Sequence, residues 1–320
     1  MKTNAALLAA AFLLTPHVHA DSFGSGGNAF TIDFVTIGNP GNPVDTGTTG
    51  LYFSPYGAVS TTFQMGKYEV SEDMIDKANT LGGLLITKDT RGANKAATSV
   101  SWNEAARFVN WLNTSSGYSP AYNFTLQPGA GGYTGNENLV LWTPSDTGYD
   151  ASNLYRNANA HYFLPSENEW YKAAFYSGSG TTYYDYATGS DTIPTAVASG
   201  TGAGTAVYGG AAVATGPADI TQAGGLSHYG TMGQDGNAFE WNESAFTAPN
   251  DVSSENRTLR GGLWNNTEVN LRSSVRLNND PTFSLSGIGF RVGSVPEPSC
   301  AMLILSASLL ALLKRRRATI

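Results

Sequence analysis

Four short motifs between Gly236 and Val292 constrain this chain more than any other feature. In order, they are the segments 236–241 (GNAFEW), 259–264 (LRGGLW), 272–276 (RSSVR) and 287–292 (GIGFRV). Glycine allows tight turns that other residues avoid, and the aromatic and arginine side chains can anchor those turns. Four such motifs in one register are hard to produce by chance, so they predict one defined fold.

Two further segments extend the pattern toward the N-terminus. Residues 68–71 (YEVS) stand at the end of a predicted strand, and residues 164–174 (LPSENEWYKAA) form a predicted helix. Together the six segments resemble the formylglycine-generating enzyme, or sulfatase-modifying factor, family. The resemblance runs from near Phe34 to Val292. It implies an α+β, C-type-lectin-like fold that is loop-rich, with few short helices and small antiparallel sheets.

The first 20 residues predict a removable secretory signal peptide. Lys2 precedes an apolar run from Ala5 to Leu14, Pro16 ends the run, and residues 18–20 (VHA) offer small side chains for cleavage before Asp21. The run is too short to span a bilayer, and no partner pattern follows it that would favour a buried helix. We therefore expect an exported protein.

Residues 295–320 resemble the PEP-CTERM sorting signal of Gram-negative bacteria. The signal consists of Pro296, Glu297 and Pro298, an apolar segment from Ala301 to Leu313, and the basic residues 314–317 (KRRR). The positive-inside rule keeps the basic residues cytoplasmic and the preceding domain on the outer side of the inner membrane. The resemblance implies transient inner-membrane anchoring, cleavage by an exosortase-type sorting protease, and a final place at the cell surface or in the extracellular matrix. An ordinary membrane anchor is the alternative.

Residues 21–294 then form one predicted domain. Only 13% of the residues are charged while 37 are glycine, which favours a loop-rich extracellular domain. The net charge of −7 and the lack of a basic patch argue against a nucleic-acid partner. The single cysteine, Cys300, lies beyond the domain, so no disulfide supports it and a large aromatic core must do so.

Local patterns predict the first elements. Residues 30–34 and 63–70 read as strands, and Ser71 can cap a helix that carries Met74, Ile75 and Ala78 on one face. Ser101 and Glu104 form a capping box, and the helix behind it is expected to bury Ala105, Phe108, Val109 and Leu112.

A second capping box, Ser166 with Glu169, opens the helix in segment 164–174, where Glu167 and Glu169 are expected to complement the helix dipole. Residues 178–225 shift to Gly, Ala, Thr and Ser. They predict a surface excursion with little regular structure, flexible at 196–210.

The resemblance also bears on chemistry. The family's oxidases bind copper through two cysteines, and the matching positions fall near Asn266 and Glu268, which cannot replace thiolates. The family's iron-dependent branch needs a histidine cluster, yet only His161 and His228 follow the signal peptide. We therefore expect no copper, no iron and no formylglycine-generating activity.

Calcium is a further possibility that the resemblance implies. The family's ligands around the Gly-Asn turn map onto Gly233, Gly236, Ala238 and Glu240, and the first of these has lost its side chain. Asp235 can compensate if the loop bends. Alternatively, Glu240 pairs with an arginine. Structural pairing with Glu240 or with loop carbonyls is the expected role of Arg260, Arg272, Arg276 and Arg291.

The loops beside the matching cysteine positions suggest a binding surface. Its members are Trp264, Asn265, Asn266, Glu268 and Asn270, together with residues 278–282. Amides next to an aromatic platform suit sugar or peptide recognition, although solvated turns would read the same way. The sequence thus predicts a non-catalytic binding protein that contacts extracellular polysaccharide or another cell-surface component. The alternatives are an unrecognised secreted oxidase or hydrolase that uses Glu240, Asp235 or His161, and a purely structural surface component.

Overall fold

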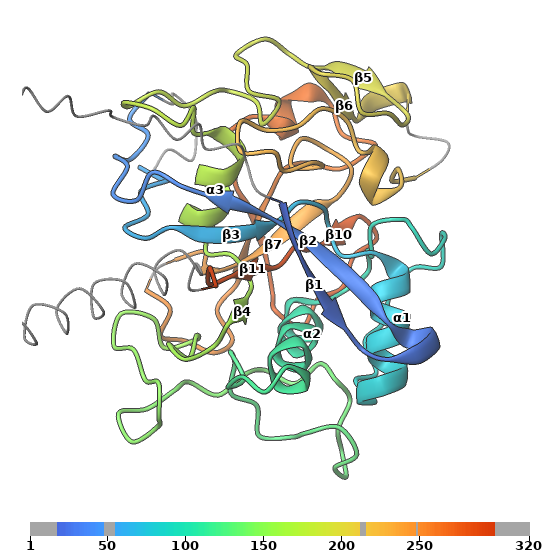
Figure 1. Ribbon diagram of the computed structural model, residues 1–320, viewed down its shortest axis with the longest axis vertical. Coiled ribbons are helices and arrows are strands. Elements are labelled where there is room, and N and C mark those ends of the chain that lie inside the picture. The colour runs from blue at the N-terminus through green and yellow to red at the C-terminus, as the bar shows by residue number, and fades with distance from the viewer. Residues whose placement is uncertain (1–17, 48–54, 212–215, 248, 298–320) are drawn as a thin grey trace, which may run out of the picture.

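The computed structural model describes residues 18–47, 55–211, 216–247 and 249–297 (Figure 1). Pro298, Cys300, the apolar tail segment and most of the expected signal peptide lie outside these ranges. Within the ranges, three α-helices and small, mostly antiparallel sheets are joined by long loops, which confirms the predicted loop-rich α+β architecture. None of the helices in this part of the chain has the length and hydrophobicity that crossing a bilayer requires.

The first sheet has the strand order β1-β2-β3-β11-β4. Its strands are β1 (Val18–Phe23), β2 (Phe30–Ile37), β3 (Phe63–Gly66), β4 (Tyr162–Phe163) and β11 (Gly293–Ser294). All pairings are antiparallel, and β11 pairs with both β3 and β4. The expected strand at 30–34 is confirmed, while the one at 63–70 ends at Gly66. The expected cleavage point before Asp21 falls inside β1.

The second sheet is built largely from the glycine-rich motifs. Its order is β10-β7-β8-β9, and its strands are β7 (Phe239–Ala245), β8 (Arg257–Arg260), β9 (Leu277–Asn279) and β10 (Ile288–Gly289). The strands β7 and β8 run antiparallel with Glu240 opposite Arg260, whereas β10 runs parallel to β7. The motifs at 236–241 and 287–292 therefore lie side by side.

The three helices begin where their caps predict. They are α1 (Glu72–Gly82), α2 (Trp102–Ser115) and α3 (Glu167–Phe175). The Oγ atoms of Ser71, Ser101 and Ser166 each accept a hydrogen bond from a first-turn amide, and both capping boxes are complete. A left-handed Gly83 with φ of 60° ends α1, a conformation that glycine adopts without strain.

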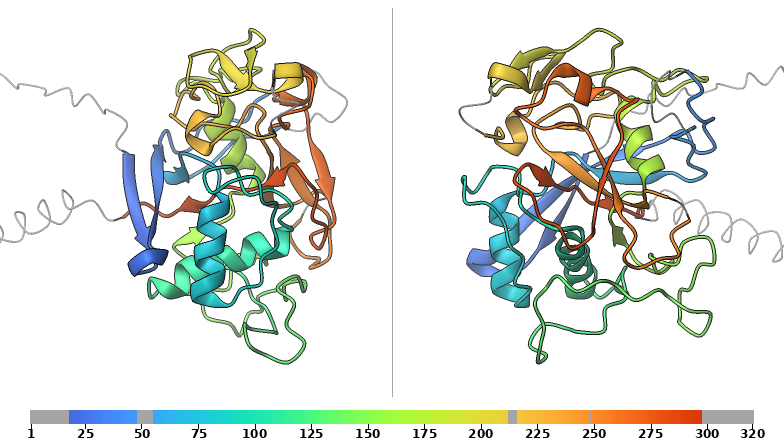
Figure 2. Two further views of the ribbon diagram at one scale, coloured as in Figure 1. Left: turned by 90° about the vertical axis from the view of Figure 1, so that its right-hand side faces the viewer. Right: turned by 180° about the vertical axis from the view of Figure 1, so that it is seen from behind.

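The main core lies between α2 and the two sheets (Figure 2). The expected face of α2, Ala105, Phe108, Val109 and Leu112, is fully buried. Phe108 packs edge-to-face on Phe290, which follows β10. The core therefore ties α2 to the last motif of the chain.

Residues 178–225 are more regular than their composition suggests. Two parallel strands, β5 (Thr195–Val197) and β6 (Thr205–Val207), form at the top of Figure 1. Each of these strands has only three residues, so regular structure is sparse in 178–225, as expected. The burial of Ala206 and Val207 against the domain argues against the flexibility expected at 196–210. Short 3-10 helices η1 (Gly26–Asn28), η2 (Gly209–Ala211), η3 (Ile220–Gln222) and η4 (Glu268–Leu271) lie in the loops.

Candidate functional site

Glu240 is the second residue of β7, directly after the buried turn of residues 233–238. Its Oε1 accepts a hydrogen bond from Nη2 of Arg291 and its Oε2 accepts one from Nε, both at 2.6 Å. The indole Nε1 of Trp170 donates to Oε2, also at 2.6 Å. Neither Glu240 nor Arg291 exposes its side chain to solvent. The alternative that Glu240 pairs with an arginine is thus confirmed.

The four residues expected to hold calcium do meet at this turn, but their donor set does not fit the ion. Arg291 already occupies both oxygens of Glu240, and Gly233, Gly236 and Ala238 offer only carbonyls. Within the described residues, no three His, Cys, Asp or Glu side chains gather as a metal site would require. The donors of this turn therefore do not suit a calcium ion.

Glu69 fills the space that the missing side chain of Gly233 would take. A Cβ on Gly233 would lie 2.9 Å from Oε2 of Glu69. This Oε2 accepts a hydrogen bond from Asn237 Nδ2 at 2.6 Å, while Oε1 is buried and has no partner within the described ranges. Burial, aided by the nearby charge of Glu240, raises the pKa of Glu69 well above its usual value. A protonated Glu69 would spare the turn a second buried negative charge.

Two more arginines of the motifs converge on Glu167 in the first turn of α3. Arg260 binds its Oε1 at 2.6 Å and Arg276 binds it at 2.8 Å. Arg260 also donates to the carbonyls of Ser273 and Val275. Structural pairing is thereby confirmed for Arg260, Arg276 and Arg291. The exposed Arg272 differs, because its Nε donates to the Tyr186 hydroxyl at 3.1 Å and not to Glu240 or a carbonyl. The predicted place of Glu167 in the first turn is right, but its partners are arginines in a buried cluster rather than the helix dipole alone.

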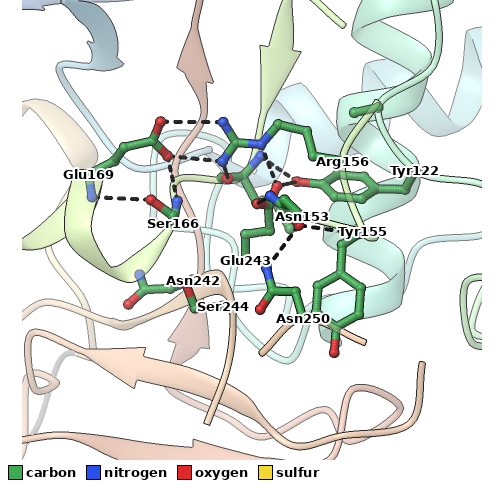
Figure 3. A network of polar contacts seen from close by, with 12 residues as sticks. Tyr122, Asn153, Tyr155, Arg156, Ser166, Glu169, Asn242, Glu243, Ser244 and Asn250 are labelled. Atoms are coloured by element: carbon green, nitrogen blue, oxygen red, sulfur yellow. Dashed lines mark hydrogen bonds and ion pairs between the residues drawn. The ribbon is translucent and has the colours of Figure 1, made fainter. Parts of the chain in front are cut away.

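A second buried network, shown in Figure 3, was not predicted from the sequence. Arg156 bridges two carboxylates: its Nε lies 2.6 Å from Glu243 and its Nη2 lies 2.9 Å from Glu169. The hydroxyl of Tyr122 and the amide of Asn153 also donate to Glu243. Glu243 lies two residues after Trp241 in β7, a strand that is buried on both faces. A charged residue in such an apolar strand needs a buried partner, and this pattern could have indicated the network.

One guanidinium faces two carboxylates in this network, and neutral donors supply the remaining hydrogen bonds. Burial lowers the pKa of Arg156, but Glu169 and Glu243 outweigh that effect and raise it well above its usual value. Burial and the charge of Glu243 raise the pKa of Tyr122 in the same network. Buried charges that are tied together by several hydrogen bonds organise a loop-rich core, so we assign the network to structure.

The binding surface expected at 264–270 keeps its amides but loses its aromatic platform. Trp264 is only 6% exposed. It packs against Val207 and Ala218, and the guanidinium of Arg91 lies 4.6 Å from its ring centroid. The expectation that Trp264 presents an exposed ring was wrong, because β6 and Arg91 cover it.

The remaining members of that surface behave differently from one another. The side chain of Asn266 accepts a hydrogen bond from the Leu263 amide at 3.1 Å, as a turn-forming residue does. Asn265 is exposed, while Glu268 and Asn270, which belong to η4, are half-buried. Asn265, Glu268 and Asn270 are therefore the side chains through which this loop can meet a ligand.

Asp235 lies beside a narrow polar pocket lined by Thr188, Ser227, Thr231 and Gln234. Its Oδ2 accepts a hydrogen bond from the Thr188 amide, and its Oδ1 has no partner in the described part of the chain. Burial raises the pKa of Asp235 to about 7.

His161 lies elsewhere, near the two ends of the described domain. Its ring stacks on Tyr118 at 4.5 Å, and Nε2 lies 3.5 Å from Glu297 of the expected sorting signal, beside Pro296. Burial lowers the pKa of His161. Among the described residues no contact joins His161, Asp235 and Glu240 to one another, so they do not form one catalytic group.

Comparisons with known proteins match this architecture. Residues 55–294 match the family model described as sulfatase-modifying factor enzyme 1-like domain. None of the curated proteins shows significant sequence similarity to the chain.

Three solved structures are similar in fold. Treponema denticola variable protein 1 superposes with a TM-score of 0.62 at 19% identity, covering 88% of this chain and 100% of its own. CarF gives 0.55 at 22% identity, covering 83% and 99%, and PvdO from Pseudomonas aeruginosa gives 0.54 at 16% identity, covering 88% and 99%. At these identities the likeness concerns the fold alone. Since the family model spans most of the chain, this protein belongs to the sulfatase-modifying factor enzyme 1-like domain family.

Proposed function

We propose that this protein is an exported, non-catalytic member of its family that binds a component of the cell surface or extracellular matrix. One observation carries the proposal. The positions that match the family's cysteine pair fall near Asn266 and Glu268, and the side chain of Asn266 accepts a hydrogen bond that holds a turn. Without thiolates these positions cannot bind Cu(I), so the loop is left as a recognition surface.

The ligand class follows from the side chains that remain free. Asn265 and Asn270 offer uncharged donors and acceptors, and Glu268 adds one acceptor without a described ion-pair partner. Such groups suit the hydroxyls of a polysaccharide. The expected sorting signal favours the same environment, because it places the domain outside the inner membrane.

The test is a glycan array probed with the full chain purified in mild detergent. The double variant Asn265→Ala/Asn270→Ala is expected to lose binding. Asn159→Ala, which removes an exposed amide on another loop, is the matched control and is expected to bind normally. A blank array, or equal binding by the double variant, refutes the proposed surface.

Catalysis and location need separate measurements. Incubation with a sulfatase peptide is expected to leave its cysteine unchanged, and formation of the aldehyde would refute the non-catalytic assignment. Mass spectrometry of protein from the native host is expected to find an N-terminus at Asp21 and a C-terminus near Pro298. Full-length protein retained in the cytoplasm would refute export.

A further inference from the structure

A pocket of about 320 Å³ opens between α1, α2 and the loop of residues 118–142. Its volume falls within the range of roughly 300–1,000 Å³ typical of small-ligand sites. The pocket is remote from the loop of η4. In Figure 1 α2 lies at the bottom, whereas β5 and β6 lie at the top, where the Gly209 amide bonds to the Asn266 carbonyl. It is thus a separate candidate site.

Aromatic rings form the walls of this pocket and are held in place by the protein itself. Trp111 stacks on Phe30 at 5.9 Å, and Gly82 leaves room for it, since a Cβ there would lie 2.6 Å from the indole. Trp142 is fixed by a hydrogen bond from its Nε1 to the Ala121 carbonyl at 3.0 Å. Both indoles are half-buried. A ligand therefore meets rings that are already ordered, which lowers the entropic cost of binding.

Arg107 lines the same pocket, and its side chain is only 3% exposed. The guanidinium lies between Phe124 and Tyr133, 4.0 Å and 4.7 Å from their ring centroids. Its Nη2 binds Glu137 at 2.7 Å, so the positive charge is already compensated. Its Nε, however, is buried and has no partner in the described part of the chain. A buried donor without a partner costs free energy that a ligand oxygen could recover.

Uncharged polar groups complete the lining. The carboxamide of Asn123 makes no hydrogen bond within the described ranges. Gln127 uses only its Nε2, which donates to the Phe124 carbonyl, so its oxygen stays available. The pocket thus combines aromatic walls with amides and one guanidinium N–H, and it presents no uncompensated charge.

We propose that this pocket binds a single neutral hexopyranose, free or at the end of a glycan. A pyranose ring has C–H faces that pack on aromatic rings and hydroxyls around its rim that bond to amides. A purely apolar ligand would leave the Asn123 carboxamide unpaired, and a carboxylate would find the charge of Arg107 already compensated by Glu137. The inference goes beyond the proposed function, because it concerns a second site that does not depend on the loop of η4.

The test is saturation-transfer NMR with the full chain in mild detergent. The probes are glucose, galactose, mannose and N-acetylglucosamine, with glucuronate and phenol as the charged and the apolar comparison. At least one neutral sugar is expected to bind saturably. Binding by none of the four, or by glucuronate or phenol alone, overturns the proposal.

Two variants locate the binding. Trp142→Leu removes a wall, and Asn123→Ala removes an amide that makes no bond in the fold and so keeps the test valid if the first variant unfolds. Each is expected to raise the Kd of the bound sugar about tenfold or more. The variant Asn159→Ala, which removes an exposed amide outside this pocket, is the matched control and is expected to leave this Kd unchanged. If Asn123→Ala binds the sugar as tightly as the wild type does, or if the control loses binding, the assignment to this pocket is overturned. Neither result affects the proposal for the loop of η4, which the glycan array tests.

Discussion

Arg291 donates a hydrogen bond to each carboxylate oxygen of Glu240, and both side chains are completely buried. The same guanidinium donates to the carbonyls of Gly66 and Met232, so one side chain of the last motif joins β3 to the turn before β7. Charge-assisted hydrogen bonds of this kind are stronger than those between neutral groups. The ion pair also explains why the turn needs no metal to compensate Glu240.

Arg291→Leu is therefore expected to be severely destabilising. Loss of one partner leaves a buried carboxylate uncompensated, which costs about 3–5 kcal/mol. Guanidinium chloride denaturation measures the free energy of unfolding. The control Arg272→Ala removes an exposed arginine of the neighbouring motif whose described hydrogen bond goes to the Tyr186 hydroxyl, and it is expected to lower the free energy of unfolding by only about 1 kcal/mol. Equal effects of the two substitutions would contradict the role assigned to the pair.

Arg156→Leu tests the network of Figure 3. Both Glu169 and Glu243 lose their arginine in this variant, so we expect a loss of at least about 3 kcal/mol in the free energy of unfolding. Arg276→Ala is the comparison, because Glu167 keeps Arg260 when Arg276 is removed. Urea denaturation should rank Arg156→Leu as the more damaging change, and the reverse order would show that Arg156 is dispensable.

The pH dependence of stability should report Asp235. Its pKa is raised from 3.8 to about 7, so the folded state holds this proton more tightly than the unfolded chain does. The free energy of unfolding is then expected to fall as the pH rises from about 4 to about 7, and to level off above that. In Asp235→Asn this contribution disappears. Between about pH 4 and pH 7, the free energy of unfolding of the variant is therefore expected to rise relative to that of the wild type by on the order of 4 kcal/mol.

The measurement is urea denaturation at a series of pH values. Exposed Asp251→Asn provides the matched control and should follow the wild-type profile. If Asp235→Asn also follows that profile, the carboxyl does not titrate in this window.

Calcium should leave the thermal stability of the protein unchanged, because Glu240 is already bound by Arg291. Differential scanning fluorimetry in EDTA and in excess calcium compares the two midpoints. A ligand of the folded state alone would raise the midpoint with its concentration. Such a rise would refute this prediction, and its loss in Glu69→Gln would place the ion at the free oxygen of Glu69.

The helices and the general fold could be predicted because their signals are local. Ser101 with Glu104 and Ser166 with Glu169 lie three residues apart, and their capping boxes form whatever the rest of the chain does. The buried face of α2 follows from a 3.6-residue period in the same way. The four motifs carried enough spacing information to indicate the family.

The candidate site depends on pairs that are distant in sequence. Trp264 is covered by Arg91, and Glu243 is bound by Arg156, yet nothing near either member marks its partner. The composition of 196–210 indicated a flexible loop, whereas the structure has two short strands there. Strands of Thr, Ala and Val as short as these gain their order from the surface they pack on, which composition does not reveal. Tertiary packing decided these features.

The position of β11 determines when the domain can close. Of the strands in the described residues it is the last to be synthesised, yet it lies between β3 and β4 inside the first sheet. Until it is made, β4 is separated from β1, β2 and β3, and the unpaired strand edges are prone to association. A product truncated before β11 would accordingly be an open, protease-sensitive chain, because the first sheet cannot form without this strand.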